Sequence, residues 1–188
     1  MTEPPDDSSC ELPGVPPKDG RRHRHFDGVT WDGVTPQVYK RSAPSSPSAP
    51  WRDVVRYTLV GETGEPTAFH LRYFEIGVGG YSSLEKHHYV HAVVVLCGQG
   101  KVIVGHEVFD VEPFDLVYVP SFQPHQFVNT GSEPFGFLCP VDADRDRPQP
   151  LTEAELSDLL SNPVVREVVR IPDMMTPSKT DPIDPVRR

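Results

Sequence analysis

Four side chains near the middle of the chain have the types and the spacing of ligands for one metal ion: Glu85, His87, His91 and His125. Neutral imidazole nitrogens and a carboxylate oxygen together suit a borderline divalent cation. Taken singly, each residue has an ordinary explanation, since a lone histidine is usually a hydrogen-bonded residue and Glu85 beside Lys86 is typical of a surface ion pair. Their combination indicates a metal site.

Strand geometry explains how these side chains would meet. Residues two apart on a strand share a face, so Glu85 and His87 would point the same way, and His91 would join them if the strand continued. His125 would come from another strand, and a barrel would bring both groups to one interior point. His88 is an alternative donor if the register slips by one residue, but such a slip would point its side chain outward.

The chain around these residues is typical of β-structure. Short runs rich in Val, Tyr and Phe are separated by Gly, Pro and Asp, which predicts an all-β sandwich or a closed barrel. Phe69, Leu71 and Tyr73 alternate with polar residues, which indicates one apolar and one polar strand face. The predicted strands are Asp53–Val60, Thr67–Ile76, Tyr89–Cys97, Lys101–Val104, Glu107–Val111, Leu116–Val119, His125–Asn129 and Phe135–Val141.

Helices are predicted only after the strands. Thr152 and Glu155 have the spacing of a capping box, which opens a helix to about Leu160. Asn162 followed by Pro163 predicts a second helix, with Asn as N-cap and Pro in its first turn. Its valines would pack on the barrel wall or on a second subunit.

The length and composition predict a single folded domain. The chain has 188 residues, of which 22 are prolines, and its ends are poor in apolar residues. We therefore expect flexible tails at 1–25 and 173–188 and one domain over 27–172. Within it, the barrel core would span 51–142 and the helices about 152–170.

The charge and the cysteines exclude several classes of function. The net charge of −9 disfavours nucleic acid as a partner, and the longest uncharged apolar run, Ala92–Cys97, is too short to span a membrane. An acidic, polar N-terminus lacks a signal core. Three widely spaced cysteines suit a reducing cytoplasm, and Cys97 and Cys139 are predicted to be small core residues. We expect a cytoplasmic protein with a small-molecule substrate.

The ligand spacing resembles the two sequence motifs of the cupin family. The first motif reads Gly, five residues, His-x-His, three or four residues, Glu, six residues, Gly. Here Gly79 is followed by five residues, Glu85-x-His87, three residues, His91, six residues and Gly98. The carboxylate and the first histidine have therefore exchanged places.

The second motif is also similar in spacing. In the family it reads Gly, five residues, Pro-x-Gly, two residues, His, three residues, Asn. This chain has Phe114, five residues, Pro120-x-Phe122, two residues, His125, three residues and Asn129. Two phenylalanines thus stand where the family pattern has glycine.

This resemblance covers about residues 67–141 and implies a double-stranded β-helix, or jelly-roll barrel, that is often dimeric. It also implies one divalent transition metal per chain, iron first, with Mn, Ni, Cu or Zn as alternatives. Some small bacterial cupins bind metal through four histidines, and Glu85 replaces the first of these here. Glu85 would either bind the metal or act beside it as a catalytic base.

The resulting hypothesis is a metal-dependent oxidoreductase of the dioxygenase type, acting on a small oxygen-rich or enolisable molecule. A redox-neutral lyase or isomerase is the alternative, as is a non-catalytic cupin that binds a small ligand. We expect a homodimer. Aromatic side chains would shape the substrate pocket: Phe69, Tyr73, Tyr118, Phe122 and Phe127.

Overall fold

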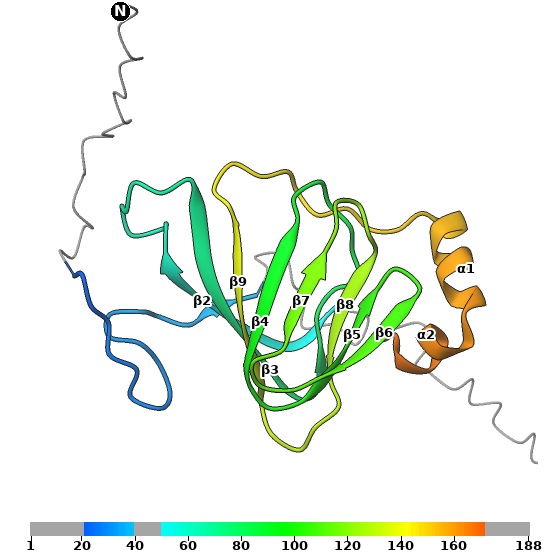
Figure 1. Cartoon of the computed structure of the whole chain (residues 1–188), viewed down its shortest axis with the longest axis horizontal. Helices are drawn as coiled ribbons and strands as arrows, with labels where there is room; N and C mark the ends of the chain where they lie inside the picture. Colours follow the sequence, from blue (N-terminus) through cyan, green and yellow to red (C-terminus); the bar gives the residue numbers. More distant parts are fainter. Residues whose placement is uncertain (1–20, 40–49, 172–188) are drawn as a thin grey trace, which may run out of the picture.

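A computed structural model of the chain describes residues 21–39 and 50–171. Within these ranges the strands form one curled antiparallel sheet in the order β6-β5-β8-β3-β9-β4-β7, with β2 on β3 and β1 on β2 (Figure 1). The strands are β1 (Gln37–Val38), β2 (Arg52–Val60), β3 (Phe69–Tyr81), β4 (His91–Cys97), β5 (Gly100–Val104), β6 (Glu107–Val111), β7 (Leu116–Val119), β8 (His125–Asn129) and β9 (Phe135–Asp142).

The predicted all-β fold is confirmed. Three predicted strands, β6, β7 and β8, have the predicted bounds, and the others differ only at their ends. The long strand β3 organises the half-barrel, because it pairs with β2 along one edge and with β9 and β8 along the other. The two-residue strand β1 was not predicted, since so short a pairing leaves no pattern in the sequence. The predicted tails lie almost entirely outside the described ranges.

Both faces of β3 carry buried side chains. Arg72, Phe74 and Ile76 are buried on the barrel side. Tyr73 is buried on the opposite side, where its ring lies 5.0 Å from that of Trp31. Residues from the N-terminal segment thus give the outer face of the sheet a core of its own. Apolar side chains of β3 therefore lie on both faces of the sheet, and apolar character alone does not identify the barrel interior.

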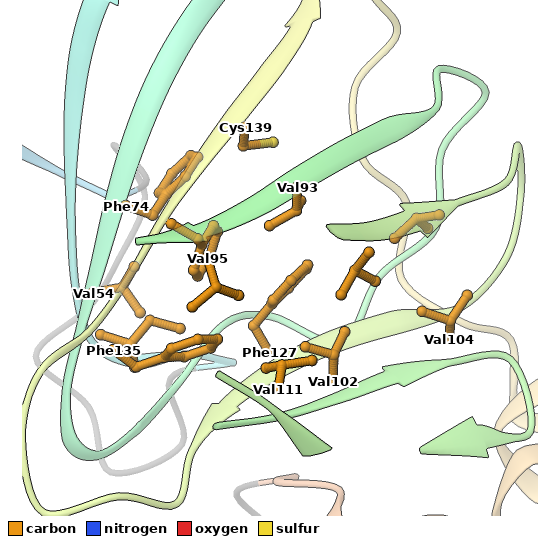
Figure 2. Close-up of a cluster of buried hydrophobic side chains, with 14 of the residues drawn as sticks. Val54, Phe74, Val93, Val95, Val102, Val104, Val111, Phe127, Phe135 and Cys139 are labelled. Carbon is orange, nitrogen blue, oxygen red and sulfur yellow. The ribbon is translucent and has the colours of Figure 1, made fainter. Parts of the chain in front are cut away.

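Apolar side chains from many strands fill part of the barrel. Figure 2 shows Val93, Val102 and Phe127 within this cluster and Cys139 at its edge. The rings of Phe127 and Phe137 stack with their centroids 4.7 Å apart. Each fully buried valine or phenylalanine contributes roughly 1.5–3 kcal/mol, so this cluster supplies much of the driving force for closing the sheet.

Two helices follow the sheet, as predicted. α1 (Glu153–Ser161) begins with Thr152 as N-cap in a complete capping box with Glu155, and α2 (Pro163–Val168) begins with Asn162 as N-cap. Val165 and Val168 pack with Ile103 and Val128 of the same chain, so the valine stripe covers the barrel wall beside β5 (Figure 1). Over the part of the chain that the structure describes, no helix is long and apolar enough to cross a membrane.

The two phenylalanines that replace motif glycines keep a glycine-like backbone. Phe114 has φ 76° and Phe122 has φ 59°, both in the left-handed region. This conformation costs a residue with a Cβ atom roughly 1–2 kcal/mol. The turns of the motif are therefore preserved by the surrounding hydrogen bonds, among them Phe122 N–H to the His87 carbonyl at 2.7 Å.

We predict that Phe114→Gly stabilises the protein. The Phe114 side chain is exposed, so little packing is lost, and glycine removes the left-handed strain. After the entropic cost of glycine, the expected gain in unfolding free energy is about 1 kcal/mol, measured by urea denaturation. Phe114→Ala retains the Cβ atom and should show no such gain; an equal gain in both variants would contradict the strain argument.

Candidate metal centre

Three imidazoles converge at the open end of the barrel. His87 lies in the turn between β3 and β4, His91 is the first residue of β4 and His125 is the first residue of β8. All three side chains are buried, and their ligand nitrogens all lie within 4.8 Å of one another. The chain bends at 87–90 and does not continue as a strand, so a turn and two strand ends bring the rings together.

Hydrogen bonds orient two of these rings. Nδ1 of His87 lies 2.7 Å from the carbonyl oxygen of Tyr89, and Nδ1 of His125 lies 2.9 Å from that of Gln123. A carbonyl oxygen only accepts, so each Nδ1 carries the proton and the in-plane lone pair of each ring is on Nε2. The Tyr89 ring also stacks on His87, with centroids 3.6 Å apart.

The third ring contacts a thiol. Nδ1 of His91 lies 3.1 Å from Sγ of Cys139, and its Nε2 lies 2.9 Å from Nε2 of His87. Two nitrogens bound at about 2.1 Å to one cation at a right angle would be about 3.0 Å apart. The separation of these two nitrogens therefore fits binding to a shared cation.

Burial keeps two of the rings neutral. It lowers the pKa of His87 to about 4 and that of His91 to about 2, and the neighbouring His125 ring acts in the same direction. Neutral imidazoles are the form that binds metal. The donor types, the orientation of the rings and their protonation together fit one divalent cation.

Glu85 and His88 lie outside this group of three rings. The backbone of Glu85 pairs with that of His125 through N–H···O distances of 2.9 and 3.2 Å, and its side chain is buried on the wall of the adjoining cavity. His88 is exposed, and its backbone N–H donates to the Asp146 carboxylate at 3.0 Å. Of the four predicted ligands, the structure thus brings the three histidines together.

A cavity of about 610 Å³ adjoins His91 and His125. Its apolar wall comprises Tyr39, Val54, Phe74, Tyr89, Phe127 and Phe137. Its ionisable wall comprises Arg56, Glu62, Arg72, Glu85, Arg145 and Arg147, together with Cys139. Such a cavity has room for a small polar substrate, with an excess of positive charge on its wall.

Only one of the five aromatic residues predicted for the pocket, Phe127, lines this cavity. Tyr73 packs on the outer face of the sheet, and the other three are exposed: Phe69, Tyr118 and Phe122. Strand alternation is the reason for the three strand residues, because neighbouring residues on a strand face opposite sides, whereas Phe122 lies in the turn between β7 and β8.

Sequence reasoning missed Arg72, Cys139 and Arg145. Arg72 is two residues from Phe74, and Cys139 is two residues from Phe137, so each shares a strand face with a core aromatic residue. This two-residue spacing from a core aromatic residue was a usable signal for an inward-facing side chain. It identifies cavity residues, however, only when the side of the sheet that encloses the cavity is known.

Comparisons with known proteins agree with this fold. The sequence model of the family described as Cupin domain matches residues 72–141. A relative from Rhodospirillum rubrum, 1-methylthio-D-xylulose 5-phosphate methylsulfurylase, is 44% identical over 151 residues, which cover 78% of this chain and 91% of the relative. The chain belongs to the cupin family.

Solved cupin structures resemble this cupin over most of its length. A cupin 2 conserved barrel domain protein from Rhodopseudomonas palustris is 40% identical with a TM-score of 0.70, and the match covers 79% of this chain and 99% of that one. A cupin-2 domain protein from Rhodospirillum rubrum is 42% identical with a TM-score of 0.66, over 78% and 95% of the two chains.

We predict that His87→Ala and His125→Ala each abolish metal binding by this cupin. Each variant removes one of three convergent nitrogens, and two imidazoles hold a divalent cation weakly. Elemental analysis of purified protein should show about one transition metal per wild-type chain and a small fraction of that in either variant.

His88→Ala is the matched control, because that side chain is exposed next to the site and should leave the metal content unchanged. We also expect Glu85→Gln to retain metal, since its carboxylate lies outside the group of three nitrogens. Full metal content in both His87→Ala and His125→Ala would refute the site.

We predict that the metal-free cupin loses stability as the pH falls from about 6.5 toward 4. The unfolded chain protonates its histidines near their ordinary pKa of 6.5, whereas burial holds the folded values of His87 and His91 lower. The stability is complete above the unfolded pKa and declines by up to about 1.4 kcal/mol per pH unit for each such histidine.

Urea unfolding in the presence of a chelator, at a series of pH values from 7 to about 4.5, measures this decline. His91→Gln removes one of the two groups, so its unfolding free energy should depend less steeply on pH. A slope equal to that of the wild type would contradict the assignment.

Proposed function

We propose that this cupin is a metal-dependent enzyme that acts on the methylthio group of a ketose phosphate. The first substrate to test is 1-methylthio-D-xylulose 5-phosphate, because the relative with 44% identity is named for it. The observation that carries the proposal is the thiol of Cys139, which lines the same cavity as the imidazoles and contacts His91. A thiol at this place can accept a sulfur substituent.

Two hydrogen-bond donors lie beside the sulfur of Cys139. A neutral His91 that binds a cation through Nε2 carries its proton on Nδ1, so it donates a hydrogen bond to Sγ. Nη2 of Arg72 donates to the same sulfur at 3.5 Å. Burial raises the pKa of Cys139, and the charge of Arg72 acts against that rise. Two donors would stabilise a thiolate once it forms.

The proposed reaction is attack of Sγ of Cys139 on the methylthio sulfur of the substrate. A sulfur–sulfur bond forms, and the bond between that sulfur and C1 breaks. Its electron pair passes to C1 and onto the adjacent C2 oxygen, and a proton then adds at C1. The sulfur of Cys139 is oxidised to a mixed disulfide while C1 is reduced, and a small thiol co-substrate would restore the free cysteine by exchange.

A bound divalent cation would supply Lewis-acid stabilisation of the negative charge on the C2 oxygen. Glu85 would transfer the proton that adds at C1. Its carboxylate lines the cavity, and its backbone pairing with His125 holds it beside the imidazoles. Proton transfer by a positioned carboxylate contributes typically about 10²- to 10⁴-fold. Buried aromatic side chains around the site would exclude bulk water.

An iron-dependent dioxygenase is the second candidate. Three imidazoles leave coordination positions for oxygen and a chelating substrate, which supports it. The name of the relative with 44% identity, a methylsulfurylase, supports transfer of a sulfur group more strongly. We also propose that this cupin forms a homodimer. Leu116 and Tyr118, two exposed apolar residues on the edge strand β7, support such an interface.

We predict that the metal-loaded protein converts 1-methylthio-D-xylulose 5-phosphate in the presence of a thiol and without oxygen. Cys139→Ser should lower turnover by at least about 10³-fold, because serine cannot form the mixed disulfide. Without added thiol, intact-protein mass spectrometry should show one methylthio group on the wild type and none on Cys139→Ser.

Cys97→Ser is the matched control, since Cys97 contacts Tyr73 and is not among the residues lining the cavity. Its turnover should equal that of the wild type. Full activity of Cys139→Ser would eliminate the thiol mechanism, and turnover that requires oxygen would favour the dioxygenase.

A further inference from the structure

Arg72 is a buried cation without a carboxylate partner among the described residues. The residue is only 7% exposed, yet no described acidic side chain forms an ion pair with it. Its hydrogen bond to Cys139 is long, at 3.5 Å, and its Nε atom has no acceptor within the described ranges. The guanidinium also lies over the Phe74 ring, 5.0 Å from the centroid. A buried charge with so little compensation is costly unless an anion completes the site.

The neighbour of Arg72 on β2 does not compensate it either. Thr58 is the register partner of Arg72, and its hydroxyl is buried without a hydrogen-bond partner among the described residues. Buried polar atoms of this kind are rare in folded proteins and call for an explanation, such as a bound ion.

A second guanidinium faces the same cavity. Nη1 of Arg145 donates to the carbonyl of Asp142 at 2.8 Å, and no ion pair to a described carboxylate satisfies its charge. Burial and the proximity of Arg72 lower the pKa of Arg145, so the two cations repel each other. Two carboxylates share the wall: Glu62, which pairs with Arg56 at 3.9 Å, and Glu85 beside the imidazoles.

We infer that Arg72 and Arg145 form an anion subsite that binds the phosphate group of a sugar phosphate. The planar fork of a guanidinium matches two phosphate oxygens, and two such groups neutralise a dianion. The identity of the phosphate carrier rests on the proposed function, whereas the anion site rests on the buried Arg72 and the half-buried Arg145, which line one cavity.

The position of Arg72 relates this subsite to the thiol. β3 lies between β2 and β9, and Cys139 is the register partner of Arg72 on β9. One part of the guanidinium contacts the sulfur, and its remaining N–H groups are available to an anion. A single small substrate would therefore place its phosphate at the arginines and its methylthio sulfur at Cys139.

The test is thermal unfolding of the metal-loaded full-length protein with inorganic phosphate and with D-xylulose 5-phosphate. A ligand that binds only the folded state raises the midpoint in a saturable way. We expect this shift for the wild type and its loss in Arg72→Met and Arg145→Met. Arg52→Met, an exposed position on β2, should retain it.

Arg72→Met has a second diagnostic property. Methionine fills similar space over Phe74 without a charge, so the unliganded variant should unfold at the same or a higher temperature than the wild type. An equal phosphate shift in Arg72→Met and wild type would overturn the inference. An equal shift with sodium chloride of matched ionic strength, or with acetate, would also overturn it.

Kinetics separate this inference from the proposed function. If the wild type turns over the methylthio sugar phosphate, Arg72→Met should raise KM by on the order of tenfold or more. An unchanged KM would reject the subsite and keep the function. No turnover by the wild type, with phosphate stabilisation that depends on Arg72, would reject the function and keep the subsite.

Discussion

Desolvation of three imidazoles is the constraint on which the open end of this barrel depends. Burial lowers the pKa of His87. The carbonyl oxygens of Tyr89 and Gln123 accept hydrogen bonds from Nδ1–H of His87 and His125. The Nε2 atoms of His87 and His91 then face each other at 2.9 Å. Without a cation, Nε2–H of His91 can donate a hydrogen bond to Nε2 of His87, whereas a bound cation would take the lone pairs of both nitrogens.

The barrel divides its interior between packing and chemistry. Valines and phenylalanines fill one part (Figure 2). The other part is the cavity lined by His91, His125, Cys139 and the buried Arg72. Low dielectric from the first part strengthens every electrostatic interaction in the second. The same β3 and β9 side chains that pack the core thereby set the conditions under which a cation, a thiol and an anion would interact.

A strained backbone conformation and a buried charge both lie close to this site. Phe122 keeps a left-handed backbone three residues before His125, and Arg72 is buried without an acidic partner in the described part of the chain. Features of this kind persist only when the surrounding structure holds them, and they cluster where binding offsets their cost. The core cluster and the two capped helices supply the stability that allows it.

Much of the fold was predictable because its signals are local. Alternation and turn residues predicted the strands within a few residues, and the capping residues Thr152 and Asn162 predicted both helix starts. The convergence of His87, His91 and His125 was also foreseeable, since the spacing of the two cupin motifs encodes it.

Tertiary structure alone decided the rest. The sequence shows that Arg72 and Tyr73 face opposite sides of a strand, but only the packing of the N-terminal segment decides which side is the outer core. Cys139 meets His91 across 48 residues of chain, through the pairing of β9 with β3 and β4. Periodicity is a property of one strand, whereas the contents of a cavity depend on the register among several, and that register is chosen by the energy of the whole packed sheet.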